Sequence, residues 1–389
     1  MNKYFYCPIL KTRQAEVNAY DMLDVSLKDV ILPIIEMTGE LGYTYPKNYK
    51  VENLRGLHRS GDINKKISKI LNLVGGRKFI LDITDDESLM FDGLKENGGL
   101  LDNNDGYKKW INFLTSDEIF KNLVIPTIQF NTLYKDDVRK QIEKLNNLFP
   151  YVAIKLPVFL TDNSEVKFNF NIVKILEWVS SFFNSDKLFV ILDFGYIRDF
   201  NIYLSVLNKK FEAMNECPFS TKIKAIIPVS SRFPASITSI GKQEHMKIFE
   251  NIVADYVRKK LLNFTVINGD YSSLYPTKYE MRAGGWIPRI DYVVKDDKNC
   301  PVEYKYIRGS SRNNSSEYFV LSRQVINSKD YIPSYIGDNI SEGDARIKNK
   351  SEGGQEGNSP SYWIAVRSNL YLTAQILYLK KEDVPFLSL

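Results

Sequence analysis

Seven short runs of β-branched and aliphatic residues recur along this chain, and they constrain its fold more than any other feature. They occupy residues 30–36, 79–82, 124–129, 152–155, 189–193, 225–230 and 264–270, and most of them end in a polar or charged residue. Continuous apolar runs of this length are typical of strands covered on both faces, as in parallel sheets. Amphipathic segments such as 136–148 and 244–262 lie between the runs, and their apolar residues recur every three or four positions, which predicts helices.

This alternation predicts an α/β fold, namely a TIM-like (β/α) barrel with a C-terminal elaboration made of a β-hairpin and a loop. In such barrels the functional groups stand at the carboxyl ends of the strands, which together form the mouth. We therefore expect polar residues at the ends of the seven runs to converge there: Glu36, Asp82, Gln129, Lys155, Asp193, Ser230 and Asp270. The architecture predicts a mouth without identifying its ligand.

The predicted barrel occupies residues 1–335. It begins with a short extended segment, 4–10, followed by a helix over about 12–27. Residues 289–294 and 302–307 are separated by a turn and predict a β-hairpin. Its second arm is our candidate for the eighth barrel strand.

Three further segments follow the hairpin. A helix is predicted over about 316–328. Residues 336–361 are rich in Gly, Ser, Asn, Glu and Lys and predict a flexible polar loop. Residues 362–389 regain apolar character, so we expect this C-terminal segment to pack back on the barrel.

Composition limits the classes of partner. The 52 basic residues are interspersed with 47 acidic ones, and the net charge is only +5, so nucleic acid is a weakly supported partner. No run reaches the roughly 18 apolar residues that a membrane span needs, and the start of the chain has no continuous apolar segment typical of a signal peptide. We therefore expect no membrane association.

Cysteine and histidine are scarce. The three cysteines, Cys7, Cys217 and Cys300, are far apart and show no CxxC spacing, which indicates a reducing, cytoplasmic compartment. With only two histidines, His58 and His245, a histidine-rich or Cys/His zinc site is excluded as a working hypothesis. A carboxylate-bound Mg²⁺ stays open as a cofactor, and no metal ligands are assigned.

Short landmarks at both ends of the chain resemble those of one known family. They are Tyr6-x-Pro8-Ile-Leu-Lys11 with Glu16 and Ala19, then 33–36, 269–271, 306–309, 343–344 and Trp363 to Asn369. Their order and separations resemble the Beta protein family of phages and bacteria over nearly the whole chain. One departure is that Asn369 is followed by Leu370 and Tyr371 where paired histidines are expected.

The resemblance implies a biological setting more than a reaction. Members of this family look like accessory proteins of phages and of bacterial anti-phage loci. It implies a recognition or effector component in phage–host conflict, with a protein partner from the same defence locus or from the phage.

The sharpest catalytic pattern is Pro288-Arg-Ile-Asp291, then eleven intervening residues, then Glu303-Tyr-Lys305, which has the form of a PD-(D/E)xK nuclease core. In such a site two carboxylates on paired strands hold Mg²⁺ and the lysine activates water. Strand alternation puts Glu303 and Lys305 on one face, where Asp291 of the neighbouring strand can meet them. The plainer interpretation is a solvated hairpin with alternating charge.

A second constellation combines Lys305, Arg308, Arg367 and Asn369 with Gly269-Asp270-Tyr271 at the mouth, if the seventh and eighth strands are neighbours. Because Gly309 follows Arg308, the backbone can approach an anion closely while the guanidinium binds it. The plainer interpretation is an ion pair of Arg308 with Asp270 or Asp344.

Paired carboxylates at the strand ends are a third pattern. Glu36 with Asp82 or Asp193 fits acid/base chemistry or a divalent ion. Buried ion pairs of these carboxylates with Lys155 and Arg308 are at least as well supported.

These observations lead to one main hypothesis, a protein that binds a ligand or partner at the barrel mouth, and they assign no catalytic residue. The predicted ligand-binding residues are Glu36, Asp193, Asp270, Lys305, Arg308 and Arg367. Two alternatives stay open: the nuclease, and a barrel hydrolase that acts on a phosphorylated or nucleotide substrate.

Overall fold

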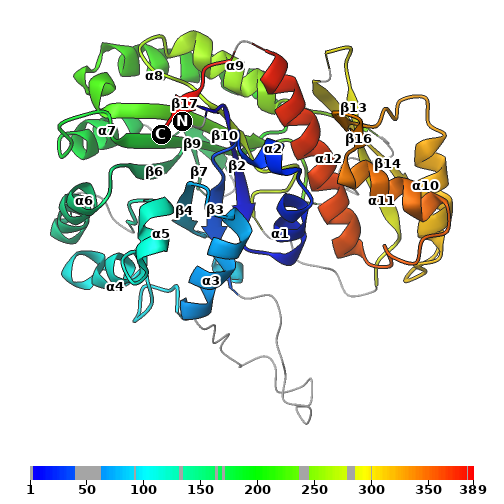
Figure 1. Cartoon of the computed structure of the whole chain (residues 1–389). Coiled ribbons are helices and arrows are strands. Elements are labelled where there is room, and N and C mark those ends of the chain that lie inside the picture. Colours follow the sequence, from blue (N-terminus) through cyan, green and yellow to red (C-terminus); the bar gives the residue numbers. More distant parts are fainter. Residues whose placement is uncertain are drawn as a thin grey trace.

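The computed structural model describes residues 3–389 apart from 40–62, 92, 131–134, 163–164, 169–170, 236–244, 278–284, 299 and 383. Its centre is a mixed α/β arrangement with two parallel sheets (Figure 1). One sheet has the order β12-β2-β3-β4-β5 and the other β10-β9-β6. The strands are β2 (Tyr6–Lys11), β3 (Ile34–Met37), β4 (Phe79–Ile83), β5 (Val124–Pro126), β6 (Val152–Pro157), β9 (Leu188–Tyr196), β10 (Ile223–Ser231) and β12 (Asn268–Asp270).

Two isolated parallel bridges join these sheets at their edges. Thr127, just after β5, pairs with Ala153 of β6, and Ile226 of β10 pairs with Val266, just before β12. The Thr127–Ala153 bridge therefore continues the first sheet into the second on one side. The Ile226–Val266 bridge does the same on the other side.

Helices cover the outer side of the parallel strands (Figure 1). They are α1 (Gln14–Asp21), α2 (Val25–Lys28), α3 (Ile63–Val74), α4 (Asn104–Leu114), α5 (Glu118–Leu123), α6 (Asp136–Leu148), α7 (Ile172–Ser180), α8 (Leu204–Glu216) and α9 (Glu250–Lys260), with short 3₁₀ turns η2 (Glu87–Leu89), η3 (Phe200–Tyr203) and η4 (Pro218–Lys222). The helix predicted over 136–148 coincides with α6. The one predicted over 244–262 is instead strand β11 (His245–Lys247) followed by α9.

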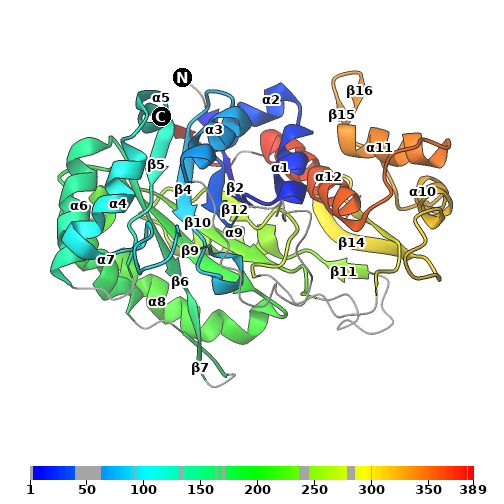
Figure 2. The ribbon, with the colours of Figure 1, turned by 90° about the horizontal axis from the view of Figure 1, so that it is seen from below.

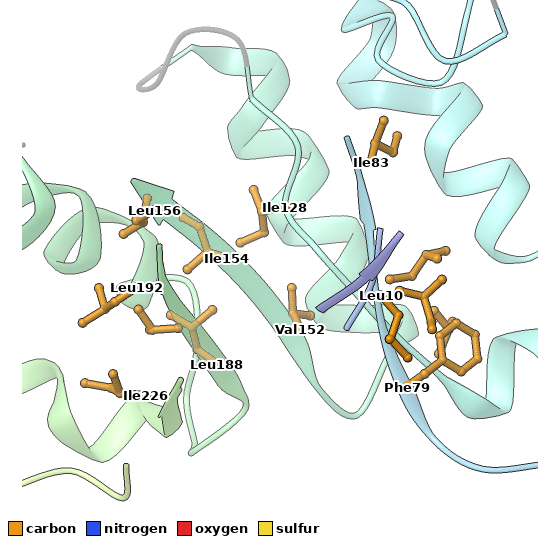
Figure 3. Close-up of a cluster of buried hydrophobic side chains, with 14 of the residues drawn as sticks. Leu10, Phe79, Ile83, Ile128, Val152, Ile154, Leu156, Leu188, Leu192 and Ile226 are labelled. Atoms are coloured by element: carbon orange, nitrogen blue, oxygen red, sulfur yellow. The ribbon is translucent and has the colours of Figure 1, made fainter. Parts of the chain in front are cut away.

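Alternation along the strands divides the core into two apolar clusters. Leu10, Ile154 and Leu192 belong to the cluster that packs against the helices (Figure 3). On the opposite face a second cluster contains Ile9, Ile34, Ile80, Ile125, Ala153, Ile191 and Ile227. Both faces of these strands are therefore buried, which explains the continuous apolar runs in the sequence.

A separate layer follows the parallel strands in the chain (Figure 2). It contains an antiparallel sheet, β11-β14-β13, with β13 (Arg289–Lys295) and β14 (Pro301–Arg308). Three helices pack with it: α10 (Glu317–Ile326), α11 (Glu342–Ser351) and α12 (Pro360–Lys381). This C-terminal layer has its own apolar cluster, which includes Ile290, Tyr304 and Trp363.

Short strand pairs complete the fold. β1 (Lys3–Tyr4) pairs with β17 (Leu387–Ser388), so both ends of the chain lie side by side (Figure 1). β7 (Phe159–Asp162) pairs with β8 (Glu165–Phe168), and β15 (Tyr335–Ile336) with β16 (Asn339–Ile340). None of the helices in the described ranges is both long and apolar enough to cross a membrane.

The prediction of the eighth parallel strand was wrong. Residues 302–307 belong to the antiparallel strand β14, and residues 6–11 form β2 between β12 and β3. Every residue of β2 is buried, as in a strand covered on both faces, whereas in β14 only Pro301 and Tyr304 are buried. Partly exposed strands of this kind are typical of an antiparallel sheet with one solvated face.

The predicted flexible loop at 336–361 was also wrong, because the segment contains β16, α11 and the first residues of α12. The Ser341 hydroxyl caps α11 by accepting a hydrogen bond from the Asp344 amide. Lys350 then orders the next turn, since its Nζ donates to the carbonyls of Gly354 and Glu356. The polar composition reflects a helix with one solvated face and local hydrogen bonds.

Candidate functional site at the carboxyl ends of the parallel strands

Polar residues follow the apolar cluster on one face of the parallel strands. Each lies two positions after a buried apolar residue and therefore shares its face. The pairs are Ile9 with Lys11, Ile34 with Glu36, Ile80 with Asp82, Ala153 with Lys155, and Ile191 with Asp193. We call Lys11, Glu36, Asp82, Lys155 and Asp193 the mouth cluster.

Two ammonium groups hold the buried carboxylates of this cluster. Nζ of Lys11 lies 2.5 Å from Oε1 of Glu36, and Nζ of Lys155 lies 3.6 Å from Oε2. Lys155 also contacts Oδ2 of Asp82 at 2.8 Å and that of the exposed Asp85 at 3.9 Å. Burial acts to raise the pKa of Glu36, but the two ammonium groups outweigh it and lower this pKa to about 2. Glu36 is therefore ionised at neutral pH.

The Asp82 carboxylate is held by neutral neighbours as well. The Thr127 hydroxyl and the Gln129 amide donate to its Oδ1 at 2.8 and 3.1 Å. The backbone of Gln129 is held in turn by the side chain of Gln141, which accepts from its amide and donates to its carbonyl, both at 2.7 Å. This second layer of hydrogen bonds fixes the positions of the polar groups.

Asp193 is the partly exposed carboxylate of the mouth cluster. Its Oδ2 accepts a hydrogen bond from the Tyr271 hydroxyl at 2.6 Å, and its Oδ1 accepts one from the Gly195 amide at 2.8 Å. Burial raises the pKa of Asp193 to about 6, against the opposing effect of Lys155. Asp193 can thus exchange a proton near neutral pH.

The other predicted ligand-binding residues lie elsewhere. Asp270 accepts hydrogen bonds from Tyr6 at 2.7 Å and Tyr371 at 2.9 Å, and Arg367 on α12 contacts Asp291 of β13. The Tyr371–Asp270 contact joins the C-terminal layer to the parallel strands, and the Arg367–Asp291 contact joins α12 to β13 within that layer. Of the six predicted residues, only Glu36 and Asp193 therefore belong to the mouth cluster.

Lys305 and Arg308 are on β14, away from the mouth cluster. Nζ of Lys305 contacts Oδ2 of Asp330 at 2.7 Å, and Arg308 is exposed at the end of the strand. The predicted ion pair of Arg308 with Asp344 does not form, because Asp344 accepts hydrogen bonds from Tyr331 and from the Ser334 amide. An anion site around Arg308 at the mouth is therefore wrong.

The predicted nuclease triad is not assembled. In the β13–β14 register Asp291 lies opposite Tyr306, while Tyr292 lies opposite Lys305. Directly opposed residues share a face, so Asp291 is on the other face of the sheet from Lys305 and Glu303. Asp291 is buried against Arg367, whereas Glu303 contacts His245 at 2.5 Å. Among the residues that the structure describes, no group of three or more His, Cys, Asp or Glu is placed to hold a metal ion.

Neither Lys11 nor Tyr271 is among the ligand-binding residues predicted from the sequence, although Tyr271 was placed near the mouth. Lys11 ends the run 6–11, which has the same pattern of apolar residues followed by a polar one as the seven runs named above. Tyr271 directly follows β12 and lies beyond the end of the apolar run, so only the register of the strands brings it to Asp193.

Four buried carboxyl groups make stability depend on pH. Burial raises the pKa of Glu16 and Glu250 from 4.5 to about 7, and that of Asp193 and Asp270 from 3.8 to about 6. Between these values the folded chain binds more protons than the unfolded chain, so the free energy of unfolding should fall as pH rises from about 5 to about 7.5. We expect each of the four groups to contribute on the order of 1 to 3 kcal/mol to this fall, measured by urea unfolding.

Glu36 has the opposite effect at lower pH. Its pKa falls from 4.5 to about 2 on folding, so its contribution is present above 4.5 and is lost as pH falls toward 2. Stability should therefore be greatest near pH 5.

Glu250→Gln should reduce the fall in the free energy of unfolding between pH 5 and 7.5. A wild-type free energy of unfolding that rises across this window would contradict the raised pKa values of the four carboxyl groups.

The sequence matches a known family over most of its length. The family pattern of the Beta protein matches residues 6–377. Protein beta of Enterobacteria phage P4 is 27% identical over 379 residues, which cover 96% of this chain and 93% of the phage protein.

Two solved structures resemble this chain weakly. A chain of the tryptophan synthase a2b2 complex of Pyrococcus furiosus has a TM-score of 0.35 at 10% identity, over 70% of this chain and 87% of that chain. The C-terminal domain of a putative chitinase from Desulfitobacterium hafniense has a TM-score of 0.28 at 10% identity, over 95% of this chain and 100% of that one. At these TM-scores neither likeness supports an argument about fold or function.

Proposed function

Since this chain belongs to the Beta protein family, we propose that it acts in phage–host conflict, as a recognition or effector component that binds a ligand at the carboxyl ends of its parallel strands. The relative in phage P4, aligned over 96% of this chain, supports the phage setting. This setting implies a cytoplasmic location and a protein partner encoded by the phage or by the same locus.

The proposal includes a TIM-like barrel. Its support is the hydrogen-bonded order of the two parallel sheets, together with the Thr127–Ala153 and Ile226–Val266 bridges at their edges. Eight parallel strands joined in this order form a ring, and the polar ends of the strands then surround one mouth.

The mouth cluster is the observation that carries the ligand site. Burying charges is costly, and apolar residues of similar size often stabilise a protein at least as well. Here Glu36 is 1% exposed, Asp82 is 4% exposed and both are held by Lys155. Titratable groups with shifted pKa values, such as Glu36 and Asp193, cluster at functional sites. We infer that this chain keeps the cluster because it binds a ligand.

Asp193→Asn tests the ligand site in cells. A bacterial host that carries the gene with its native neighbouring genes is challenged with a panel of phages, and the efficiency of plating is measured. The wild-type locus should reduce plating of at least one phage, and Asp193→Asn should restore plating at least about tenfold, because the substitution removes the carboxylate that accepts from Tyr271 and Gly195.

The matched control is Asp330→Asn, which changes a carboxylate paired with Lys305 outside the mouth cluster. It should plate as the wild type does. Equal loss in both variants, at equal protein levels, would contradict the mouth assignment, and a wild-type locus without effect on any phage would contradict the proposed setting.

A further inference from the structure

A pocket of about 620 Å³ adjoins the mouth cluster at the ends of β4 and β5. This volume is within the range of small-molecule sites. Its apolar side includes Ile83, Met90, Leu101 and Phe130, and the buried Tyr107 also lines it. We call it the β4–β5 pocket.

Hydrogen bonds connect the β4–β5 pocket to the mouth cluster through Gln129, which lines it. The Gln129 Nε2 donates to Asp82 and to the Thr127 hydroxyl, and this fixes the orientation of the amide group. The residue is 7% exposed, and no described residue donates to its Oε1. Within the described part of the chain, Gln129 is thus a fixed acceptor at the pocket wall without a donor.

The charged residues around the β4–β5 pocket are mainly acidic. Among the described residues that line it, Asp85, Glu87 and Glu96 are acidic and Lys95 alone is basic. Behind them the mouth cluster already pairs its lysines with Glu36, Asp82 and Asp85, so it offers no further positive charge to the pocket. The pocket therefore favours hydrogen-bond donors and positive charge, and it disfavours anions.

We propose that the β4–β5 pocket binds a small cationic ligand, an amine attached to an apolar or aromatic body. The body contacts Met90, Leu101 and Phe130, while the ammonium group donates to Gln129 and lies among the acidic side chains. This inference rests on the proposed ligand site at the strand ends and names the chemical class of its ligand. It replaces the phosphorylated substrate that the sequence suggested.

Three compounds that share an indole body and differ in charge test this proposal. Tryptamine is a cation, tryptophol is neutral and indole-3-acetate is an anion. Dissociation constants are measured for the full-length protein by saturation-transfer NMR titration. Tryptamine should bind at least about tenfold more tightly than indole-3-acetate, which corresponds to 1.4 kcal/mol, and tryptophol should be intermediate.

Asp85→Asn identifies the pocket as the place of binding. Asp85 lines the pocket and its side chain is 72% exposed, so we expect the variant to fold. It should weaken tryptamine binding about threefold and leave tryptophol unchanged. The control Glu143→Gln removes an exposed carboxylate on α6 that does not line the pocket, and should change neither constant.

Three results would overturn the inference: no binding of tryptamine, equal binding of tryptamine and indole-3-acetate, or equal effects of Asp85→Asn and Glu143→Gln. Each of them leaves the outcome of Asp193→Asn in cells untouched. A wrong ligand class is thereby distinguished from a wrong ligand site.

Discussion

Replacing Lys155 with alanine should lower the free energy of unfolding by about 3–5 kcal/mol at pH 7. The Lys155 ammonium group contacts Glu36 and Asp82, whose side chains are 2% and 5% exposed. Without it Asp82 keeps the neutral donors Thr127 and Gln129, and Glu36 keeps Lys11 and the Thr84 hydroxyl. An unpaired buried carboxylate costs far more than a surface charge, because the low local dielectric does not screen it. Urea unfolding followed by circular dichroism measures the loss.

The matched control for this prediction is Lys224→Ala. Lys224 also forms an ion pair with an aspartate, Asp186, at 3.2 Å, but the Asp186 side chain is 62% exposed. Its loss should cost at most about 1 kcal/mol. A Lys155→Ala protein as stable as Lys224→Ala would show that the mouth cluster is well hydrated, and the argument from buried charge would then fail.

The mouth cluster was partly predictable because its members repeat one local rule. Glu36, Asp82, Lys155 and Asp193 each end an apolar run, and parallel strands bring their carboxyl ends to one edge. The same rule pointed to Asp270, but its side chain contacts Tyr6 and Tyr371 instead. A polar residue at a strand end can face either side, and only the alternation within that strand decides which.

The nuclease prediction failed at a level that local pattern does not reach. The spacing of Glu303 and Lys305 is that of one strand face, and this part holds. The position of Asp291 depends on how β13 and β14 pair, and a shift of one residue exchanges the two faces. The loop between β13 and β14 sets this register. The length of the loop in the sequence did not by itself identify which residues pair.

The C-terminal layer was hardest to predict because long-range packing stabilises it. Residues 342–351 are polar, yet α11 buries Gly343, Asp344 and Ile347. The Gly343 amide donates to Asn369 on α12, and a side chain at Gly343 would meet the Asn369 Oδ1 at 2.7 Å. Contacts of this kind join segments far apart in the chain and leave little trace in local composition.

Replacing Arg367 with alanine should destabilise the contact between the C-terminal layer and the parallel strands by about 3 kcal/mol. Arg367 is 2% exposed on α12. Its Nη1 lies 2.7 Å from Oδ2 of Asp291 on β13, and its guanidinium lies 3.7 Å from the ring centroid of Phe233, after β10. The substitution removes an ion pair, a cation–π contact and much packed volume at once. Amide hydrogen exchange should show loss of protection in β13 and α12 before the parallel strands.

Two further variants decide why Arg367→Ala destabilises. Arg346→Ala removes an arginine whose partner Glu342 is 47% exposed, and should cost at most about 1 kcal/mol. Asp291→Asn should lose about as much stability as Arg367→Ala. It removes the carboxylate that pairs with both the buried Arg367 and Arg289. Wild-type stability of Asp291→Asn would contradict this account, since burial acts to raise the pKa of Asp291 and only the two guanidinium groups lower it. On this account the carboxylate that resembled a metal ligand in the sequence joins α12 to β13 and is paired with two guanidinium groups.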